Sequence, residues 1–179
     1  MSPKQLNIHI KILTRPKAPR TVRRMISAMR QVFNSANIDV QLASKQVFNL
    51  KKNPDLAALN VLDVGTCSGN ATDEQIEIAQ HRNSVPDRQI VIYVCQSLTD
   101  AFAGCAVHAD DSKPMAVISA KNATYYTMAH EVGHLLGLEH PAVEDPDQLM
   151  DPGGHKDLHP LPFLVESEID KMRNSPFLI

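Results

Sequence analysis

Residues 130–140 combine the residue types and the spacing that a metal site needs. The segment reads His-Glu-Val-Gly-His-Leu-Leu-Gly-Leu-Glu-His. On a helix, His130 and His134 lie one turn apart and project from the same face, so both imidazoles can bind one ion. Gly137 can adopt the left-handed backbone conformation that ends a helix abruptly, which turns His140 back toward the first two histidines. The spacing therefore predicts one metal ion shared by three histidines.

Glu131 occupies the position of a general base beside that ion. An offset of about 100° from the preceding histidine places its carboxylate near the metal without making it a ligand. Three neutral imidazoles leave the fourth position of a tetrahedral zinc ion to water, as in catalytic sites, whereas structural zinc sites have four protein ligands. Bound zinc makes such a water a nucleophile. The pattern predicts one catalytic Zn²⁺ and hydrolysis, with Glu131 as the catalytic residue.

The histidines have two other interpretations. As core histidines on an amphipathic helix they would need a coincidence, because the full pattern arises by chance in only about 10⁻⁵ of chains with this composition. Alternatively, they hold a structural zinc ion whose fourth ligand is His155, His159 or Asp151. This second interpretation predicts a zinc-binding module without peptidase activity.

The segment resembles the HExxHxxGxxH signature of the metzincin clan of zinc endopeptidases. Every fixed position of that signature is matched, by His130, Glu131, His134, Gly137 and His140. The resemblance implies a zinc-dependent endopeptidase whose partners are protein or peptide substrates. A zinc amidase that acts on a non-protein amide uses the same hydrolytic groups and stays an alternative.

A second segment resembles the Met-turn of this clan. Residues 149–152 read Leu-Met-Asp-Pro, which implies that Met150 lies beneath the three imidazoles as a hydrophobic floor. Astacins and serralysins have a tyrosine as an extra zinc ligand where this chain has Pro152, so three protein ligands are expected. The chain wall that includes Pro152 is expected to contact the substrate.

Residues 103–107 would form the antiparallel edge strand that borders the cleft in this clan. An extended peptide substrate adds to such a strand through backbone hydrogen bonds. Gly104, Cys105 and Ala106 are therefore candidate substrate-binding residues. The alternative is an ordinary sheet strand whose glycine allows close packing.

Hydrophobic periodicity predicts the elements that position these groups, with a period of two in strands and of three to four residues in helices. The expected strands cover residues 6–12, 38–42, 90–94, 103–108 and 115–119. The expected helices cover residues 20–36, 72–80, 124–136 and 166–173. Residues 53–55 indicate a turn, and residues 141–162 are rich in Pro, Gly, Asp and His, which indicates irregular structure.

Together with the resemblance, these elements predict an α+β, zincin-like fold. We expect a mixed, mostly parallel twisted sheet with an antiparallel edge strand, helices packed on it, an active-site helix and a small irregular C-terminal subdomain that ends in a helix. The 179 residues suit a single catalytic domain. Its N-terminal subdomain is expected to cover about residues 1–137 and its C-terminal subdomain about residues 138–179.

Composition and charge bear on the partners. Apolar residues make up 43% and charged residues 21% of the chain, as in globular proteins, and no apolar run is long enough for a membrane span. Eleven of the 18 lysines and arginines fall within residues 1–52, where Asp39 is the single acidic residue. No aromatic residues interleave with these charges for base stacking. We therefore expect a solvated basic face and no nucleic-acid partner.

Localisation and control of activity are less determined. The N-terminus shows no secretory signal, so the protein is expected in the cytoplasm or exported by a route that the sequence does not reveal. No pro-segment with an inhibitory cysteine is visible, which leaves control to an inhibitor or another regulatory partner. The three cysteines, Cys67, Cys95 and Cys105, allow one disulfide and one free thiol. Cys105 is interpreted as a buried small apolar residue, with a cleft thiol or a disulfide to Cys67 or Cys95 as alternatives.

Overall fold

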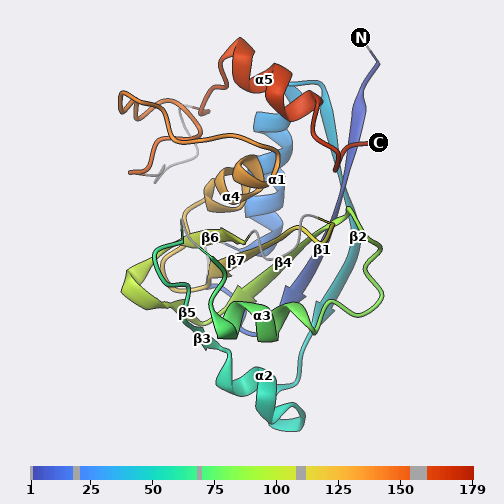
Figure 1. The fold of residues 1–179 in the computed structure, drawn as a ribbon, viewed down its shortest axis with the longest axis vertical. Coiled ribbons are helices and arrows are strands. Elements are labelled where there is room, and N and C mark those ends of the chain that lie inside the picture. The colour runs from blue at the N-terminus through green and yellow to red at the C-terminus, as the bar shows by residue number, and fades with distance from the viewer. Residues whose placement is uncertain (1, 18–20, 68–69, 108–111, 154–160) are drawn as a thin grey trace.

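A five-stranded mixed sheet organises the molecule (Figure 1). The computed structural model describes residues 2–17, 21–67, 70–107, 112–153 and 161–179. The strands, in spatial order, are β2 (Ile38–Val47), β1 (Lys4–Ile12), β4 (Ile90–Cys95), β7 (Met115–Ser119) and β6 (Gly104–Val107). All neighbouring strands pair in parallel except β6 and β7, which are antiparallel. The prediction of a mostly parallel sheet with an antiparallel edge strand is confirmed.

Alternation along the strands divides the core between the two faces of the sheet. On one face, the even-numbered residues of β1 and β4 pack against α1 (Val22–Asn34) and α4 (Thr127–Leu135). On the other face, the odd-numbered residues of β4 pack against α2 (Pro54–Ala58) and α3 (Asp73–Ala79). Strand β4 is buried on both faces, which explains its nearly unbroken β-branched sequence.

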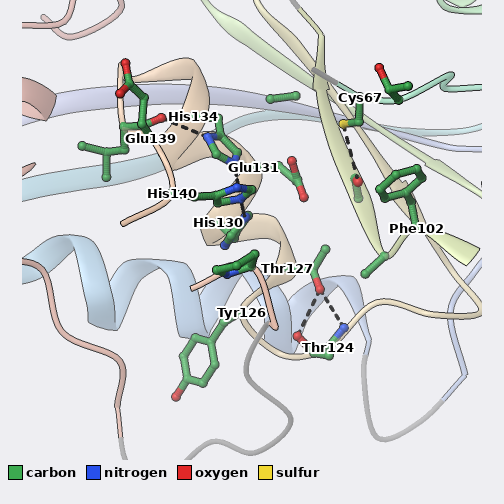
Figure 2. Close-up of a pocket in the computed structure, with 16 residues that line it drawn as sticks. Cys67, Phe102, Thr124, Tyr126, Thr127, His130, Glu131, His134, Glu139 and His140 are labelled. Carbon is green, nitrogen blue, oxygen red and sulfur yellow. Dashed lines mark hydrogen bonds between the residues drawn. The ribbon is translucent and has the colours of Figure 1, made fainter. Parts of the chain in front are cut away.

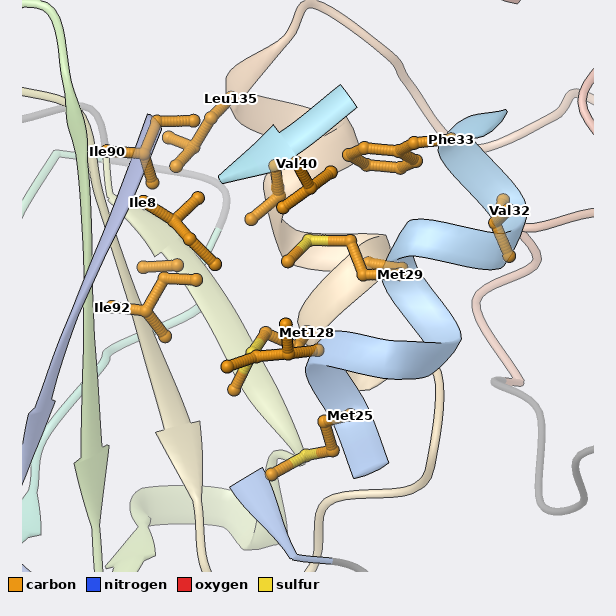
Figure 3. Packing of buried hydrophobic residues seen from close by; sticks show 14 of the residues in the cluster. Ile8, Met25, Met29, Val32, Phe33, Val40, Ile90, Ile92, Met128 and Leu135 are labelled. Atoms are coloured by element: carbon orange, nitrogen blue, oxygen red, sulfur yellow. The ribbon is translucent and has the colours of Figure 1, made fainter. Parts of the chain in front are cut away.

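Helix α1 covers the sheet beside α4, the helix that contains His130 and His134. Thr21 caps its N-terminus by accepting a hydrogen bond from the Arg24 N–H at 3.4 Å. Figure 3 shows Met25 and Met29 extending from α1 toward the sheet residues Ile8 and Ile92. The methionines are core residues, because flexible thioethers fill the space between the helix and the sheet.

The C-terminal segment returns to the first strand. Helix α5 (Glu166–Arg173) ends with Arg173, whose guanidinium donates to the carbonyl oxygens of Ala36 and Asn37 at 2.9 and 3.1 Å. Beyond it, the backbones of Ile179 and Gln5 exchange two hydrogen bonds of 2.8 and 3.0 Å. The chain ends therefore lie side by side, as the N and C labels in Figure 1 also show.

Several elements differ from the sequence-based expectation. The predicted turn at residues 53–55 contains the start of α2, because Pro54 occupies the first helical position, where its missing N–H costs no hydrogen bond. Strand β2 extends to Val47, beyond the predicted end at residue 42, through backbone pairing with β1 although its side chains are exposed there. Four short elements were not predicted: β3 (Val61–Leu62), β5 (Ser97–Leu98), η1 (Leu50–Lys52) and η2 (Thr99–Ala101).

The remaining predicted elements are present with small shifts of their ends. The Thr72 hydroxyl and the Gln75 side chain form the expected capping box of α3. No helix in the described part of the chain is long and apolar enough to cross a membrane. His108, at the end of a predicted strand, and the candidate ligands His155 and His159 lie outside the described residues.

The double-sided packing of the sheet predicts where truncation is costly. Changing Ile92, which is fully buried in β4, to Ala should lower the free energy of unfolding by about 2 to 5 kcal/mol, because it leaves a cavity between the sheet and α1. The matched change Ile76→Ala on α3, where the side chain is 48% exposed, should cost no more than about 1 kcal/mol. Urea unfolding followed by circular dichroism measures both values, and equal losses would contradict the described core.

Candidate metal centre

Helix α4 supplies two of the three histidines of the predicted site. His130 and His134 project from one face of α4, with ring centroids 4.8 Å apart. The His130 Nδ1 atom lies 2.9 Å from the Leu149 carbonyl oxygen, and the His134 Nδ1 atom lies 2.9 Å from the Leu138 carbonyl oxygen. A carbonyl oxygen only accepts hydrogen bonds, so both Nδ1 atoms carry the proton. Each Nε2 atom therefore carries its lone pair, as a metal ligand requires.

The turn after α4 brings in the third histidine. Gly137 has a φ of +98°, a conformation that favours glycine. The N–H groups of Gly137 and Leu138 close the helix end by bonding to the carbonyl oxygens of His134 and Gly133, both at 3.0 Å. The following chain returns His140, whose Nε2 atom lies 3.2 Å from the Nε2 atoms of both other histidines. Figure 2 shows the three rings meeting at one point.

This donor set fits a tetrahedral metal ion. Two nitrogen ligands at the usual zinc distance of about 2.0–2.1 Å lie about 3.3 Å apart in a tetrahedral site, close to the observed 3.2 Å. Lone pairs that face one another at this distance repel unless a cation lies between them. Within the described residues, these histidines are also the one group of three or more potential metal ligands whose donor atoms are close together, all within 4.8 Å.

Asp151 is not part of this group. Its carboxylate is buried and accepts a hydrogen bond of 3.0 Å from the Gly153 N–H. Asp151 is thus satisfied locally and gives no support to the interpretation of a metal ion closed by a fourth protein ligand. The other two candidates for that role, His155 and His159, fall within the undescribed residues 154–160.

Met150 packs closely against α4. It is fully buried, and a Cβ atom added at Gly133 would come within 2.8 Å of its sulfur. Gly133 therefore lacks a side chain because the Met150 thioether occupies that space. The structure places Met150 against the helix that carries two histidines, while its role as the floor of a metal site stays a prediction.

Glu131 points from α4 toward the edge strand β6. Its side chain is 7% exposed, and Figure 2 shows the carboxylate beside the histidine rings. Burial raises the pKa of Glu131 to about 8, while a hydrogen bond to the backbone of Ala106 acts in the opposite direction. A Cβ atom at Gly104 would lie only 2.6 Å from the Glu131 Cγ atom. The carboxylate therefore rests against the backbone of β6.

A comparison with family models decides the family. Residues 20–141 match the model described as metallo-peptidase family M12B, reprolysin-like. This range includes α1, α4, all three histidines and every strand of the main sheet except β1. The chain belongs to this reprolysin-like metallopeptidase family. A search of curated proteins found no match.

Solved structures share the fold of this reprolysin-like chain. Metalloproteinase-II from Bacteroides fragilis aligns with a TM-score of 0.59 at 18% identity, over 96% of this chain and 53% of that protein. Archaemetzincin from Methanopyrus kandleri aligns with a TM-score of 0.55 at 12% identity, over 94% of each chain. The chain thus spans about half the length of the Bacteroides protein. These likenesses confirm the predicted zincin-like fold.

A cleft of about 550 Å³ lies between α4 and β6 in the reprolysin-like domain. Gly104, Ala106 and Pro152, three of the predicted substrate-binding residues, line it together with Glu131 and the histidines. Ala103, from the predicted edge strand, also lines the cleft. The sequence analysis did not assign the other lining residues, which are Thr66, Cys67, Phe102, Thr124, Tyr126, Thr127, Leu138 and Glu139. Their positions depend on loops that no periodicity reveals, although proximity in sequence to α4 could have pointed to residues 124–127.

Cys105 differs from the prediction in two respects. It does not line the cleft, because side chains alternate along β6 and its sulfur faces the second core cluster on the opposite side of the sheet. It is also not a free apolar thiol, since it forms a disulfide with Cys67. Cys95 stays free and fully buried, and burial raises the pKa of its thiol to about 12.

The convergence of the three Nε2 atoms predicts strong dependence of metal binding on each ring. The change His140→Ala should weaken binding of Zn²⁺ and Co²⁺ by at least about 100-fold, because loss of outer-shell partners alone costs about 10- to 100-fold. His81→Ala removes a histidine outside the group and should leave both affinities unchanged. Isothermal titration of the metal-free protein measures the affinities. Equal affinities for the two variants would contradict the assignment of the ligands.

Proposed function

We propose that this reprolysin-like chain is a zinc-dependent endopeptidase, with His130, His134 and His140 as metal ligands and Glu131 as general base. One observation carries the proposal. The buried Glu131 carboxylate shares a cleft with three converging imidazole nitrogens and lies against an edge strand. Metal ligands, a base and a backbone surface for a peptide thus occur together, as peptide hydrolysis requires.

Zinc is the proposed metal because of the donor set. Imidazole nitrogens suit zinc, and three of them at tetrahedral spacing are the common ligand set of catalytic zinc sites. When bound, zinc supplies Lewis acidity, which polarises the scissile carbonyl and makes water more acidic. The hydrogen bonds from the Nδ1 atoms of His130 and His134 to the carbonyl oxygens of Leu149 and Leu138 hold the rings in place for this role.

Glu131 moves the proton in the proposed reaction. Its carboxylate accepts a proton from the attacking water and returns it to the nitrogen of the leaving amine. Burial against β6 favours the neutral carboxyl, which helps Glu131 to hold the proton between these two transfers. The contact with Gly104 restricts the side chain to one region of the cleft.

Strand β6 is the proposed binding surface for the peptide backbone. Among the described residues, its ladder partner is β7 alone. The Ser119 N–H bonds to the Ala103 carbonyl oxygen at 2.9 Å, which sets the alternation of backbone groups along the pair. The backbone groups of Cys105 and Val107 consequently face β7, and those of Gly104 and Ala106 face away from β7, where Ala106 also bonds to the Glu131 carboxylate. An extended substrate can add there as a further strand.

The described lining of the cleft bears on carboxypeptidase activity. No lysine or arginine is among the described residues that line the cleft. A carboxypeptidase needs a cationic group to bind the terminal carboxylate of its substrate. The lining thus favours an endopeptidase over a carboxypeptidase.

The first test uses peptides with acetylated N-termini and amidated C-termini. The zinc-loaded protein should cleave a diverse set of them internally, and Glu131→Ala should reduce kcat by at least about 100-fold while zinc stays bound, because proton transfer is lost. Glu166→Ala, at an exposed position of α5, is the matched control and should retain full activity. Mass spectrometry identifies the products. Cleavage by Glu131→Ala at the wild-type rate would refute the proposed role of Glu131.

The second test examines strand addition. N-methylation removes one backbone donor at a time from a cleaved peptide. Methylation of the amides that pair with Gly104 or Ala106 should reduce kcat/KM by about 10-fold or more, because each loses its hydrogen bond to a carbonyl group of β6. Methylation of the intervening amides, which point away from β6, should have a smaller effect. Uniform sensitivity along the peptide would contradict binding as a strand.

A further inference from the structure

Two residues of β6 hold the Glu131 side chain. The absence of a Cβ atom at Gly104 makes room for it, since such an atom would lie 2.6 Å from Cγ, 2.7 Å from Oε1 and 2.9 Å from Cδ of Glu131. The backbone of Ala106 forms a hydrogen bond with the carboxylate. The position of Glu131 therefore depends on the position of β6.

Strand β6 is short and has a single ladder partner among the described strands. It has four residues, and in the described part of the chain it pairs only with β7. Cys105 lies between Gly104 and Ala106, and its side chain is 1% exposed on the opposite face of the sheet. There the Cys67–Cys105 disulfide ties the centre of the strand to a loop 38 residues earlier in the chain.

The loop that carries Cys67 is itself anchored. The Val64 N–H donates to the Thr99 hydroxyl at 3.1 Å, and the Cys67 N–H donates to the Val64 carbonyl oxygen at 3.0 Å. The Gln75 side chain of α3 also contacts the Cys105 sulfur at 3.5 Å. The disulfide thus gives β6 a second attachment besides its ladder with β7.

We propose that the Cys67–Cys105 disulfide is a positioning element for Glu131, which fixes β6 so that Gly104 and Ala106 hold the carboxylate beside the metal ligands. This role rests on the proposed peptidase function of the site. It replaces the substrate-binding role that the sequence suggested for Cys105. The disulfide acts from behind the strand, through the two residues that flank Cys105 and contact Glu131.

The metal ligands do not share this dependence. His130 and His134 are oriented by the carbonyl oxygens of Leu149 and Leu138, and His140 by the turn at Gly137. None of these groups belongs to β6 or to the Cys67 loop. Loss of the disulfide should therefore reduce turnover and leave metal binding intact, because a misplacement of about 1 Å can cost about 100-fold in rate.

The test reduces the disulfide in the zinc-loaded protein with a water-soluble phosphine. A thiol reagent is unsuitable because thiolates bind zinc. One phosphine and one water convert the disulfide to two thiols and one phosphine oxide, so the reaction balances. Active sites are then counted by titration with a peptide hydroxamate, a metal-binding inhibitor, so that kcat refers to folded, metal-loaded sites. We expect kcat per site to fall about 10- to 100-fold, with KM and zinc content within about twofold, and to recover on reoxidation.

Three variants separate this effect from others. The double variant Cys67→Ser/Cys105→Ser should show the same low kcat without reduction and no further response to the phosphine. Cys95→Ala, which removes the buried free thiol, should keep the wild-type kcat and the wild-type response. Gly104→Ala retains the disulfide and displaces Glu131 directly, so it should lower kcat with zinc still bound.

Each outcome bears on a definite claim. An unchanged kcat per site after reduction overturns the positioning role, as does a rise in KM alone, which would make Cys67 part of the substrate-binding wall. Loss of zinc or of hydroxamate-titratable sites also overturns it, because the disulfide would then stabilise the whole site. Inactivity of the oxidised, zinc-loaded wild-type protein would instead be a failure of the proposed peptidase function.

Discussion

Three imidazole nitrogens that face one another impose the main constraint on this structure. The His140 Nε2 atom lies 3.2 Å from those of His130 and His134, a spacing that is unfavourable without a cation between them. The protein maintains it through two backbone carbonyl groups and the turn at Gly137. Packing of α4 against the sheet and α1 stabilises this arrangement.

The same helix also carries Glu131, the proposed general base, on the side of the cleft that faces β6. Glu131 follows His130 directly, so the rotation of about 100° per residue along the helix directs its carboxylate toward β6. The edge strand therefore serves two purposes in the proposed mechanism. Its residues Gly104 and Ala106 hold the base and border the space for the peptide. The Cys67–Cys105 disulfide lies on the opposite face of this strand and, in our proposal, fixes its position.

The sequence predicted those features that depend on local spacing. The pattern from His130 to His140 indicated a helix, a glycine turn and a returning third ligand, and the structure brings the three histidines together. The capping box at Thr72 and the buried strand at residues 90–94 were equally local and equally clear. The family resemblance supplied the antiparallel edge strand, which periodicity cannot distinguish from a parallel one.

Features that depend on contacts between distant segments were not predictable. Cys67 and Cys105 are 38 residues apart, and three cysteines allow three pairings. A candidate strand does not reveal which face each residue takes, so the sequence analysis placed Cys105 in the cleft together with its neighbours. The space that Gly104 leaves for Glu131 likewise becomes visible only when β6 and α4 are packed together.

The number of protein ligands at the metal tests the central claim most directly, because an open coordination position distinguishes a peptidase from a closed zinc-binding module. X-ray absorption at the zinc edge of the loaded protein measures it. We expect three imidazole nitrogens and one oxygen at about 2.0–2.1 Å, with the oxygen replaced on addition of a peptide hydroxamate. A fourth imidazole or a carboxylate from the chain that the hydroxamate does not displace would contradict the proposed function.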